Sequence, residues 1–137
     1  MNADKSKEIV VLGGSFAGVT AAYDLKRELG DRHHITVIDK NDRFVFIPSL
    51  IWVPFGWRTP EQISFPLQPS LGRQGIDFLQ ATVERIDPEQ RYIELGDGRT
   101  AGSRRMSYDY LVIATGPHVD FAAVEGLGPA GGHDFMW

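Results

Sequence analysis

Apolar and polar residues alternate along the chain in a way that predicts strands and helices in succession. Residues 9–12 are four consecutive apolar residues, typical of a strand buried on both faces of a parallel sheet. A glycine-containing turn follows, and residues 19–29 have the pattern of a helix. Gly30 stands where a left-handed C-cap is expected. The β-branched run at residues 34–39 predicts a second parallel strand.

Residues 41–57 are the most unusual stretch, because they carry three phenylalanines and two tryptophans. Pro48, Pro54 and Gly56 within them argue against a regular strand or helix. So apolar a loop must be covered, or must itself cover something flat. It either packs on its own core or forms a wall beside an aromatic cofactor or lipophilic substrate, and the residues by themselves favour neither reading.

The middle of the chain predicts short helices followed by extended segments. Thr59-Pro60-Glu61-Gln62 has an N-cap with proline at the first helical position, and residues 67–73 predict a second short helix. From residue 76 the period becomes strand-like. The segments that we expect to form an antiparallel meander, inserted into the main fold, are residues 76–86, 91–95 and 104–108, with turns at 87–90 and 96–98.

A last apolar strand, residues 110–114, predicts a return to the parallel sheet. It ends in Thr115-Gly116-Pro117, small residues that let backbone approach a ligand at the carboxyl edge of the sheet. Residues 118–137 are glycine-rich and predict irregular structure. The expected fold class is therefore α/β. One Rossmann-like domain would span residues 1–137, with a parallel sheet and an inserted antiparallel β-meander, and would be incomplete.

The turn between the first strand and helix is the strongest chemical signal. Gly13 permits a sharp turn, and Gly18 lets the helix pack closely on the strand. The helix N-terminus would then point free N–H groups and a positive partial charge at a dinucleotide pyrophosphate. Ser15 departs from the G-x-G-x-x-G pattern at its second glycine, and we expect its side chain near a phosphate oxygen. A purely structural glycine turn remains the alternative.

Asp39 ends the second predicted strand, 21 residues beyond Gly18. From this position a carboxylate accepts hydrogen bonds from ribose hydroxyls, and it disfavours a 2′-phosphate, so NADP is not expected here. The alternative is a solvated aspartate at a strand end. Glycine turn, helix and acid at the right spacing together favour the binding role.

The composition of the chain limits the kinds of partner and chemistry that we expect. The 137 residues carry a formal net charge of −4, so nothing favours nucleic acid or an anionic membrane surface. There is no cysteine, which excludes disulfides and thiolate chemistry within the chain. No apolar run approaches the ~20 residues of a membrane span, and the charged N-terminus is not that of a signal peptide. His33 and His34 would point to opposite faces of a strand, so we assign no metal site.

These features carry a family resemblance. The segments 11–18 and 108–116, together with Asp39 and the meander, resemble the FAD-binding half of a flavoprotein of the disulfide reductase type. Within that group, the segment Asn41-Asp42-Arg43-Phe44-Val45-Phe46-Ile47-Pro48-Ser49, with Trp52-Val53, Gly56-Trp57 and residues 63–67, resembles sulfide:quinone oxidoreductases. The resemblance covers the whole chain, and it favours the cofactor-wall reading of the aromatic stretch.

The resemblance implies FAD as cofactor and a set of residues to hold it. Asp39 would bind the ribose, Lys40 would lie near the adenine, and the backbone of Val83 would contact the adenine. The other implied cofactor-binding residues lie on the pyrophosphate (Gly13, Gly14, Ser15, Phe16, Ala17 and Gly18), beside the pyrophosphate and ribityl chain (Thr115 and Gly116) or near the flavin ring (Pro48 and Ser49).

The resemblance also implies a reaction, the two-electron oxidation of sulfide through cysteine sulfurs beside the flavin, with electrons passed to a quinone. None of those cysteines is present. We therefore expect an N-terminal fragment of a longer protein, inactive by itself and located in the cytoplasm or peripherally on a membrane. We assign no catalytic residue to it. Residues 44–57, left exposed in such a fragment, would be disordered or would pack against another copy.

Two other readings remain open at this point. The chain resembles, by the same glycine turn and Ala114-Thr115-Gly116, type II NADH:quinone oxidoreductases and the flavoprotein subunit of flavocytochrome c sulfide dehydrogenases. A non-enzymatic nucleotide-binding or assembly module is the alternative from a different class.

Overall fold

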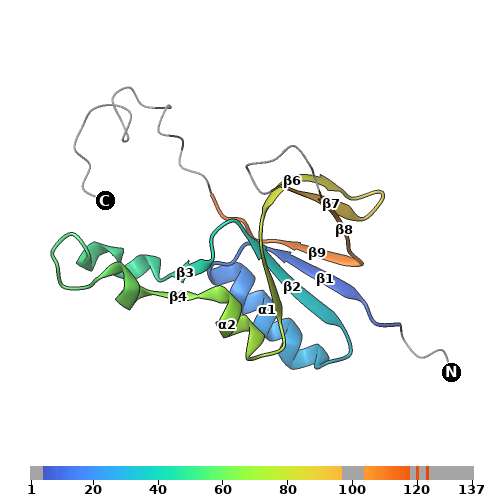
Figure 1. Cartoon of the computed structure of the whole chain (residues 1–137), viewed down its shortest axis with the longest axis horizontal. Coiled ribbons are helices and arrows are strands. Elements are labelled where there is room, and N and C mark those ends of the chain that lie inside the picture. The colour runs from blue at the N-terminus through green and yellow to red at the C-terminus, as the bar shows by residue number, and fades with distance from the viewer. Residues whose placement is uncertain (1–4, 97–103, 118–119, 121–122, 124–137) are drawn as a thin grey trace.

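A four-stranded parallel sheet forms the centre of the molecule, in the order β5–β2–β1–β9 (Figure 1). The computed structural model describes residues 5–96, 104–117, 120 and 123. The strands of this sheet are β1 (Glu8–Leu12), β2 (His34–Asp39), β5 (Asp77–Gln80) and β9 (Tyr110–Ile113). All three pairings between them are parallel. The predicted α/β class and Rossmann-like sheet are confirmed.

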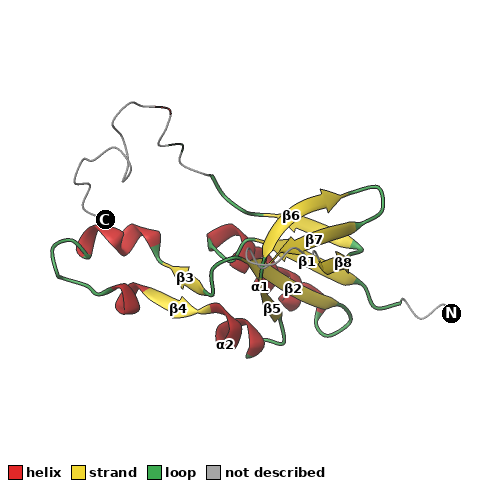
Figure 2. Cartoon of the chain, turned by 45° about the horizontal axis from the view of Figure 1, so that its top comes forward, coloured by secondary structure: helices red, strands yellow, loops and turns green. Residues whose placement is uncertain are grey.

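Each face of the sheet is covered by a different layer. Helices α1 (Phe16–Leu29) and α2 (Leu67–Gly72) lie on one face, and the meander of β6 (Thr82–Asp87), β7 (Tyr92–Gly96) and β8 (Arg104–Ser107) lies on the other (Figures 1 and 2). Successive side chains of a strand point to opposite faces. The unbroken apolar run of β1 follows from this arrangement, because both of its faces are buried.

Two hydrophobic clusters result. On the helix side, Ile9 and Val11 of β1 pack with residues of α1 and α2. On the meander side, Val10 and Leu12 pack with Ile93 and other residues of β7. Both clusters contain side chains that are completely buried.

The segment 76–86 is not the single meander strand that the sequence predicted. It forms two strands, and the first of them, β5, pairs with β2 in the parallel sheet. The chain changes layers at Ala81, whose N–H donates to the Asp39 carbonyl at 3.0 Å. Only after this point does β6 begin its antiparallel pairing with β7. A period-2 pattern is the same in both sheets, so the pattern alone missed the change of partner.

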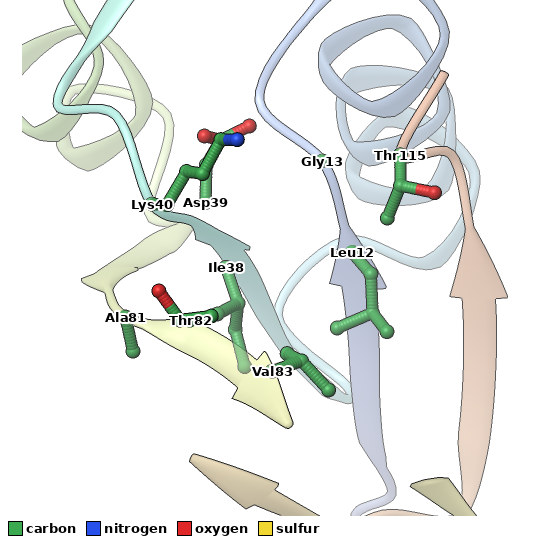
Figure 3. A pocket seen from close by; sticks show the side chains of 9 residues that line it. All are labelled: Leu12, Gly13, Ile38, Asp39, Lys40, Ala81, Thr82, Val83 and Thr115. Atoms are coloured by element: carbon green, nitrogen blue, oxygen red, sulfur yellow. The ribbon is translucent and has the colours of Figure 1, made fainter. Parts of the chain in front are cut away.

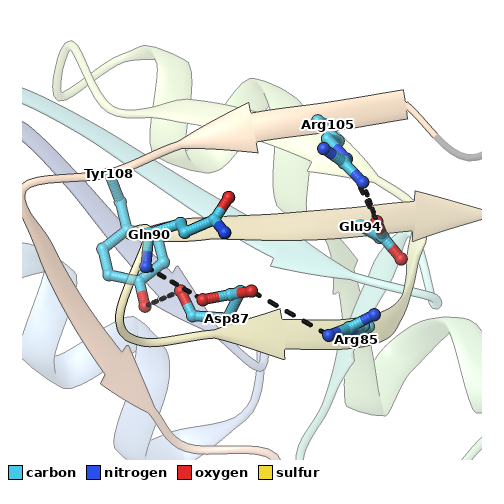
Figure 4. Close-up of polar contacts among 6 residues, drawn as sticks. All are labelled: Arg85, Asp87, Gln90, Glu94, Arg105 and Tyr108. Atoms are coloured by element: carbon cyan, nitrogen blue, oxygen red, sulfur yellow. Dashed lines mark hydrogen bonds and ion pairs between the residues drawn. The ribbon is translucent and has the colours of Figure 1, made fainter.

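The meander itself is confirmed, with β7 between β6 and β8. Its outer side carries polar contacts (Figure 4). Arg105 pairs with Glu94 at 3.0 Å, and its guanidinium lies 4.5 Å from the ring centre of Tyr92. The predicted turn after Asp87 is present, and Gln90 N–H donates to the Asp87 carboxylate at 2.9 Å. The predicted turn at 96–98 falls on residues outside the described part, apart from Gly96 at the end of β7.

Residues 43–66 form an arm that projects from the sheet and helices (Figure 1). It consists of β3 (Arg43–Val45), η1 (Ile47–Trp52), η2 (Pro60–Ile63) and β4 (Ser64–Pro66), where η is a 3₁₀-helix. Strands β3 and β4 pair antiparallel. The prediction that prolines prevent regular structure here was wrong. Pro48 lies in the first turn of η1, where its missing N–H has no intrahelical partner to lose.

Most large apolar side chains of the arm are exposed. Phe55 and Trp57 are each 66% exposed, and Ile51 is 62% exposed. The structure describes the whole arm, and its disorder or its packing against another copy stays a prediction. At its second helix, the predicted N-cap is confirmed, because Thr59 and Gln62 form a reciprocal capping box.

The remaining boundaries agree with the sequence or differ by a few residues. Helix α1 begins at Phe16, three residues before the predicted start, and Gly30 caps it with a φ of 61°. Helix α2 is present where a second short helix was predicted. The irregular tail of residues 118–137 lies outside the described part, except for Asp120 and Ala123. Among the described residues, no helix has both the length and the apolar character needed to cross a membrane.

Candidate dinucleotide-binding site

The turn from β1 into α1 is built on two glycines that leave no room for a side chain. Gly13 has a φ of 107°, and a Cβ on it would collide with the backbone carbonyl of Ala114 at the end of β9. A Cβ on Gly18 would collide with the carbonyl oxygen of Gly13. The first helical turn is therefore pressed against the end of the strand, as the sequence predicted for these two positions.

The N-terminus of α1 opens toward solvent beside this turn. Ser15 is the N-cap, and its side chain makes no capping hydrogen bond. The first helical hydrogen bond runs from Val19 N–H to the Ser15 carbonyl at 2.9 Å. The amides of residues 16–18 precede that bond and have no acceptor within the helix. Because the first turn of α1 contains no acidic residue, its partial positive charge is available to an anion.

Asp39 faces the same turn from the end of β2. One oxygen of its carboxylate accepts the Gly14 N–H at 2.6 Å, and the other accepts the Asn41 N–H at 2.8 Å. Gly14 also leaves little room for a side chain, because a Cβ there would lie 2.6 Å from Leu67 of α2 and 3.2 Å from the Asp39 Cβ. The acid and the glycine turn, far apart in the sequence, thus form one unit.

A cavity of about 230 Å³ lies at the carboxyl edge of the sheet, directly beside this unit (Figure 3). Of the predicted site residues, the ones that line it come from three strand ends and from the start of β6: Gly13, Asp39, Lys40, Val83 and Thr115. This edge is where open α/β sheets bind their ligands. The structure therefore brings together residues that the sequence placed up to about 100 positions apart.

Four lining residues were missed by the sequence analysis: Leu12, Ile38, Ala81 and Thr82. Leu12 and Ile38 were detectable, because they are the last apolar residues of two strands that were predicted to end at a ligand. Ala81 and Thr82 carried no local signal, because their place depends on the change of sheet between β5 and β6.

The other predicted residues lie around the cavity rather than in its lining. Ser15, Phe16 and Ala17 are exposed at the start of α1, whereas Gly18 is buried. Gly116 is exposed, with a φ of 71°. Pro48 and Ser49 lie in η1 of the arm. Their roles in binding a cofactor remain predictions.

The arm reaches the site through its aromatic rings. The ring of Phe16 lies edge-on to that of Phe44, with ring centres 5.0 Å apart, and 5.6 Å from that of Phe46. Phe44 in turn stacks on Phe65 of β4 at 4.7 Å. The start of η1, where Pro48 lies, is therefore close to the start of α1.

The sequence relationships agree with this geometry. Residues 7–135 match the family described as pyridine nucleotide-disulphide oxidoreductase. The chain belongs to this family. As a member of the pyridine nucleotide-disulphide oxidoreductases, it has its glycine turn, its strand-end acid and its meander in one dinucleotide-binding arrangement.

Several relatives of this family member are quinone-linked enzymes. It is 38% identical over 118 residues to the sulfide-quinone reductase of Aquifex aeolicus, covering 86% of this chain and 26% of that protein. The solved structure of the Aquifex aeolicus sulfide:quinone oxidoreductase superposes with a TM-score of 0.77 at 37% identity, covering 85% of this chain and 26% of that one. The type II NADH:quinone oxidoreductase of Staphylococcus aureus is 26% identical, covering 91% of this chain and 30% of the relative.

The chain thus spans about a quarter to a third of the length of these relatives. The comparisons confirm the predicted resemblance at the level of the family and of its sulfide-quinone reductase branch. They place the chain in an oxidoreductase family that also contains NADH:quinone oxidoreductases.

Proposed function

We propose that the cavity and the adjoining helix N-terminus bind FAD. The observation that carries this proposal is the joint position of Asp39, Lys40 and Val83 around one cavity, with the glycine turn and Thr115 forming its other side. The carboxylate of Asp39 suits a ribose, the cation of Lys40 suits an adenine edge, and the apolar side chain of Val83 suits an adenine face. The free amides at the start of α1 suit the pyrophosphate.

The donors and acceptors present fit such a group. Each oxygen of the Asp39 carboxylate accepts one backbone N–H and keeps a lone pair for a ribose hydroxyl. The glycines at 13 and 14 bring backbone up to the ligand where a side chain would be in the way. Asp39 also disfavours a 2′-phosphate, because two negative charges would be held together in a partly buried place.

The cavity would hold one end of FAD. Its volume of about 230 Å³ lies below the ~300–1,000 Å³ of sites that enclose a whole drug-sized ligand. We therefore assign the adenosine to the cavity and the pyrophosphate to the start of α1. When bound, FAD supplies two-electron oxidation and reduction. The residues of this chain bind it and orient its adenosine half.

We propose that the whole protein oxidises sulfide and reduces a quinone, in the cytoplasm or at a membrane surface. The support is the 38% identity to the Aquifex aeolicus sulfide-quinone reductase, against 26% to the Staphylococcus aureus type II NADH:quinone oxidoreductase. The alternatives are an NADH:quinone oxidoreductase, a flavocytochrome c sulfide dehydrogenase flavoprotein and a nucleotide-binding module without a reaction. Residues 1–137 would form the N-terminal part of the FAD-binding domain.

A visible absorption spectrum of the purified chain, before and after addition of FAD and gel filtration, tests the cofactor. We expect flavin absorbance to travel with the protein and ADP to compete for the site. A protein that binds neither FAD nor ADP in calorimetry would contradict the assignment. Because the chain has no cysteine, we also expect the 137 residues alone to consume no sulfide with a quinone present, and measurable quinone-dependent consumption would refute that expectation.

A further inference from the structure

The side chain of Phe16 lies where two parts of the molecule meet. Phe16 is the first residue of α1 and directly follows the N-cap of the helix that faces the pyrophosphate site. Its side chain points toward the arm, and its ring packs against Phe44 and Phe46. It remains 41% exposed, so it is not a core residue of the sheet and helices.

The arm is joined to the rest of the chain at its base. There, Leu67 N–H donates to the Asp42 carbonyl at 2.8 Å, just outside β3 and β4. Beyond the base, the hydrogen bonds described for the arm are internal, such as Phe46 N–H to the Ile63 carbonyl at 2.8 Å and Arg43 to Ser64. Phe44 of β3 is itself buried in the helix-side cluster, so the base of the arm also packs on the helices. The ring of Phe16 contacts Phe44 there and also contacts Phe46, which lies farther along the arm.

The contacts between Phe16 and the arm lie outside the adenosine cavity, beside the start of α1. The cavity is lined by the ends of β1, β2 and β9 and by the start of β6, and no residue of the arm takes part in its lining. A ligand that extends beyond the pyrophosphate must leave this cavity past the start of α1. There, Phe16 and the arm rings form an apolar, aromatic surface.

We infer that Phe16 is a positioning residue that holds the arm against the start of α1, so that the arm contacts the half of the dinucleotide beyond the pyrophosphate. This inference rests on the proposed binding of FAD and names the residue that links the two parts of its site. The ring of Phe16 is edge-on to Phe44 and tilted to Phe46, and edge-to-face contact at this distance is one of the two arrangements that aromatic pairs prefer. Loss of the ring removes the contact with Phe46 and loosens the arm beyond its base, and it leaves the adenosine cavity unchanged.

The test compares the wild-type chain with Phe16→Ala and Phe16→Leu, using Phe55→Ala as the matched control. Phe55 belongs to the arm, is exposed, and packs only on Trp57 among the described rings. Calorimetry gives the Kd for FAD, which has both halves, and for ADP, which ends at the pyrophosphate. We expect Phe16→Ala to raise the Kd for FAD about five- to tenfold and to change that for ADP less than twofold. Phe16→Leu should fall between, and Phe55→Ala should match the wild type for both FAD and ADP.

A second readout does not need a bound cofactor. Trypsin cleaves after Arg58, which is exposed near the end of the arm, and mass spectrometry gives the rate of that cleavage under native conditions. We expect Phe16→Ala to raise this rate at least threefold while cleavage after Arg27 in α1 stays unchanged. An unchanged rate after Arg58 overturns the inference, as does an equal loss of FAD and ADP binding. If the wild type binds neither ligand, the proposed function fails, and the cleavage rates still decide whether Phe16 holds the arm.

Discussion

The Asp39 carboxylate accepts a hydrogen bond from the Gly14 amide at 2.6 Å, and so joins the end of β2 to the turn that begins α1. This bond explains why an acid at the strand end and a glycine turn belong together. The acid binds the turn on one side and leaves a lone pair for a ligand on the other. One residue thereby shapes the turn and contributes to the proposed ribose site.

Replacing Asp39 by Ala should weaken ADP binding. The variant loses the acceptor for ribose hydroxyls and leaves the Gly14 N–H without its carboxylate. We expect a loss of about 1–3 kcal/mol, the usual value for hydrogen bonds to a charged group. Isothermal calorimetry measures it, and Asp42→Ala is the matched control, because it removes the same charge from an exposed position three residues away. If the Asp39→Ala variant bound ADP as tightly as the wild type, Asp39 would have a structural role only.

Adding one methyl group at Gly18 should destabilise the fold. The new Cβ would collide with the Gly13 carbonyl, and backbone on both sides must shift. Such overpacking costs about 1–3 kcal/mol of unfolding free energy. Urea unfolding followed by circular dichroism measures the change for Gly18→Ala.

The control for that experiment is Gly72→Ala in α2. A Cβ at Gly72 would meet no atom within 4 Å, so the only effect is the higher helix propensity of alanine. We expect Gly72→Ala to be neutral or to stabilise by up to about 1 kcal/mol. If Gly18→Ala were as harmless as Gly72→Ala, the close packing of α1 on β1 would be disproved.

The acid stability of the protein should depend in part on Asp109. Its carboxylate accepts the Glu8 N–H at 2.9 Å, and Lys7 lies nearby at 3.4 Å. Chiefly the bond from Glu8, and secondarily the charge of Lys7, hold the pKa of Asp109 below its ordinary value of 3.8. A carboxyl with a lowered pKa in the folded state stabilises the fold above its unfolded pKa, and loses this effect as the pH falls through the folded pKa.

We therefore expect Asp109→Asn to lower the midpoint of urea unfolding at pH 7, with a gap to the wild type that shrinks below pH 3.8. Unfolding curves from pH 7 to pH 2 measure this gap. A gap that is constant over the whole range would show that charge on Asp109 contributes nothing. Asp77, exposed at the start of β5, offers an aspartate control in Asp77→Asn.

The exposed aromatic residues of the arm should cause the isolated chain to self-associate. Trp52, Phe55 and Trp57 form a continuous set of rings, with ring centres 5.1 Å and 5.4 Å apart. Apolar surface of this kind is usually covered in soluble proteins. Sedimentation velocity over a range of concentrations should show a dimer or larger species that the double variant Phe55→Ser, Trp57→Ser reduces. A wild-type chain that stays monomeric at about 100 μM would contradict the prediction.

Much of the fold could be predicted from residues that act locally. The runs of β1 and β2 predicted two parallel strands, because strands covered on both faces need apolar residues at nearly every position. The apolar run of β9 predicted a third, although Tyr110 and Ile113 at its two ends are exposed. Part of the site was also predicted from local sequence. Gly13 and Gly18 are read from spacing, and Asp39 from its distance beyond them.

What the sequence by itself determined is the set of elements and the glycine turn, because these depend on side-chain periodicity and on φ angles within a few residues. The tertiary structure decided which strands pair. It split residues 77–87 between two sheets at Ala81, paired β3 with β4 in the arm, and brought Thr82 into the lining of the cavity. Partners in a sheet are chosen by packing between distant segments, and a local pattern of alternating residues is the same for every partner. The role of Asp39 depends on both. The sequence predicted its position at the end of a strand, and its hydrogen bond with Gly14 exists only in the folded chain.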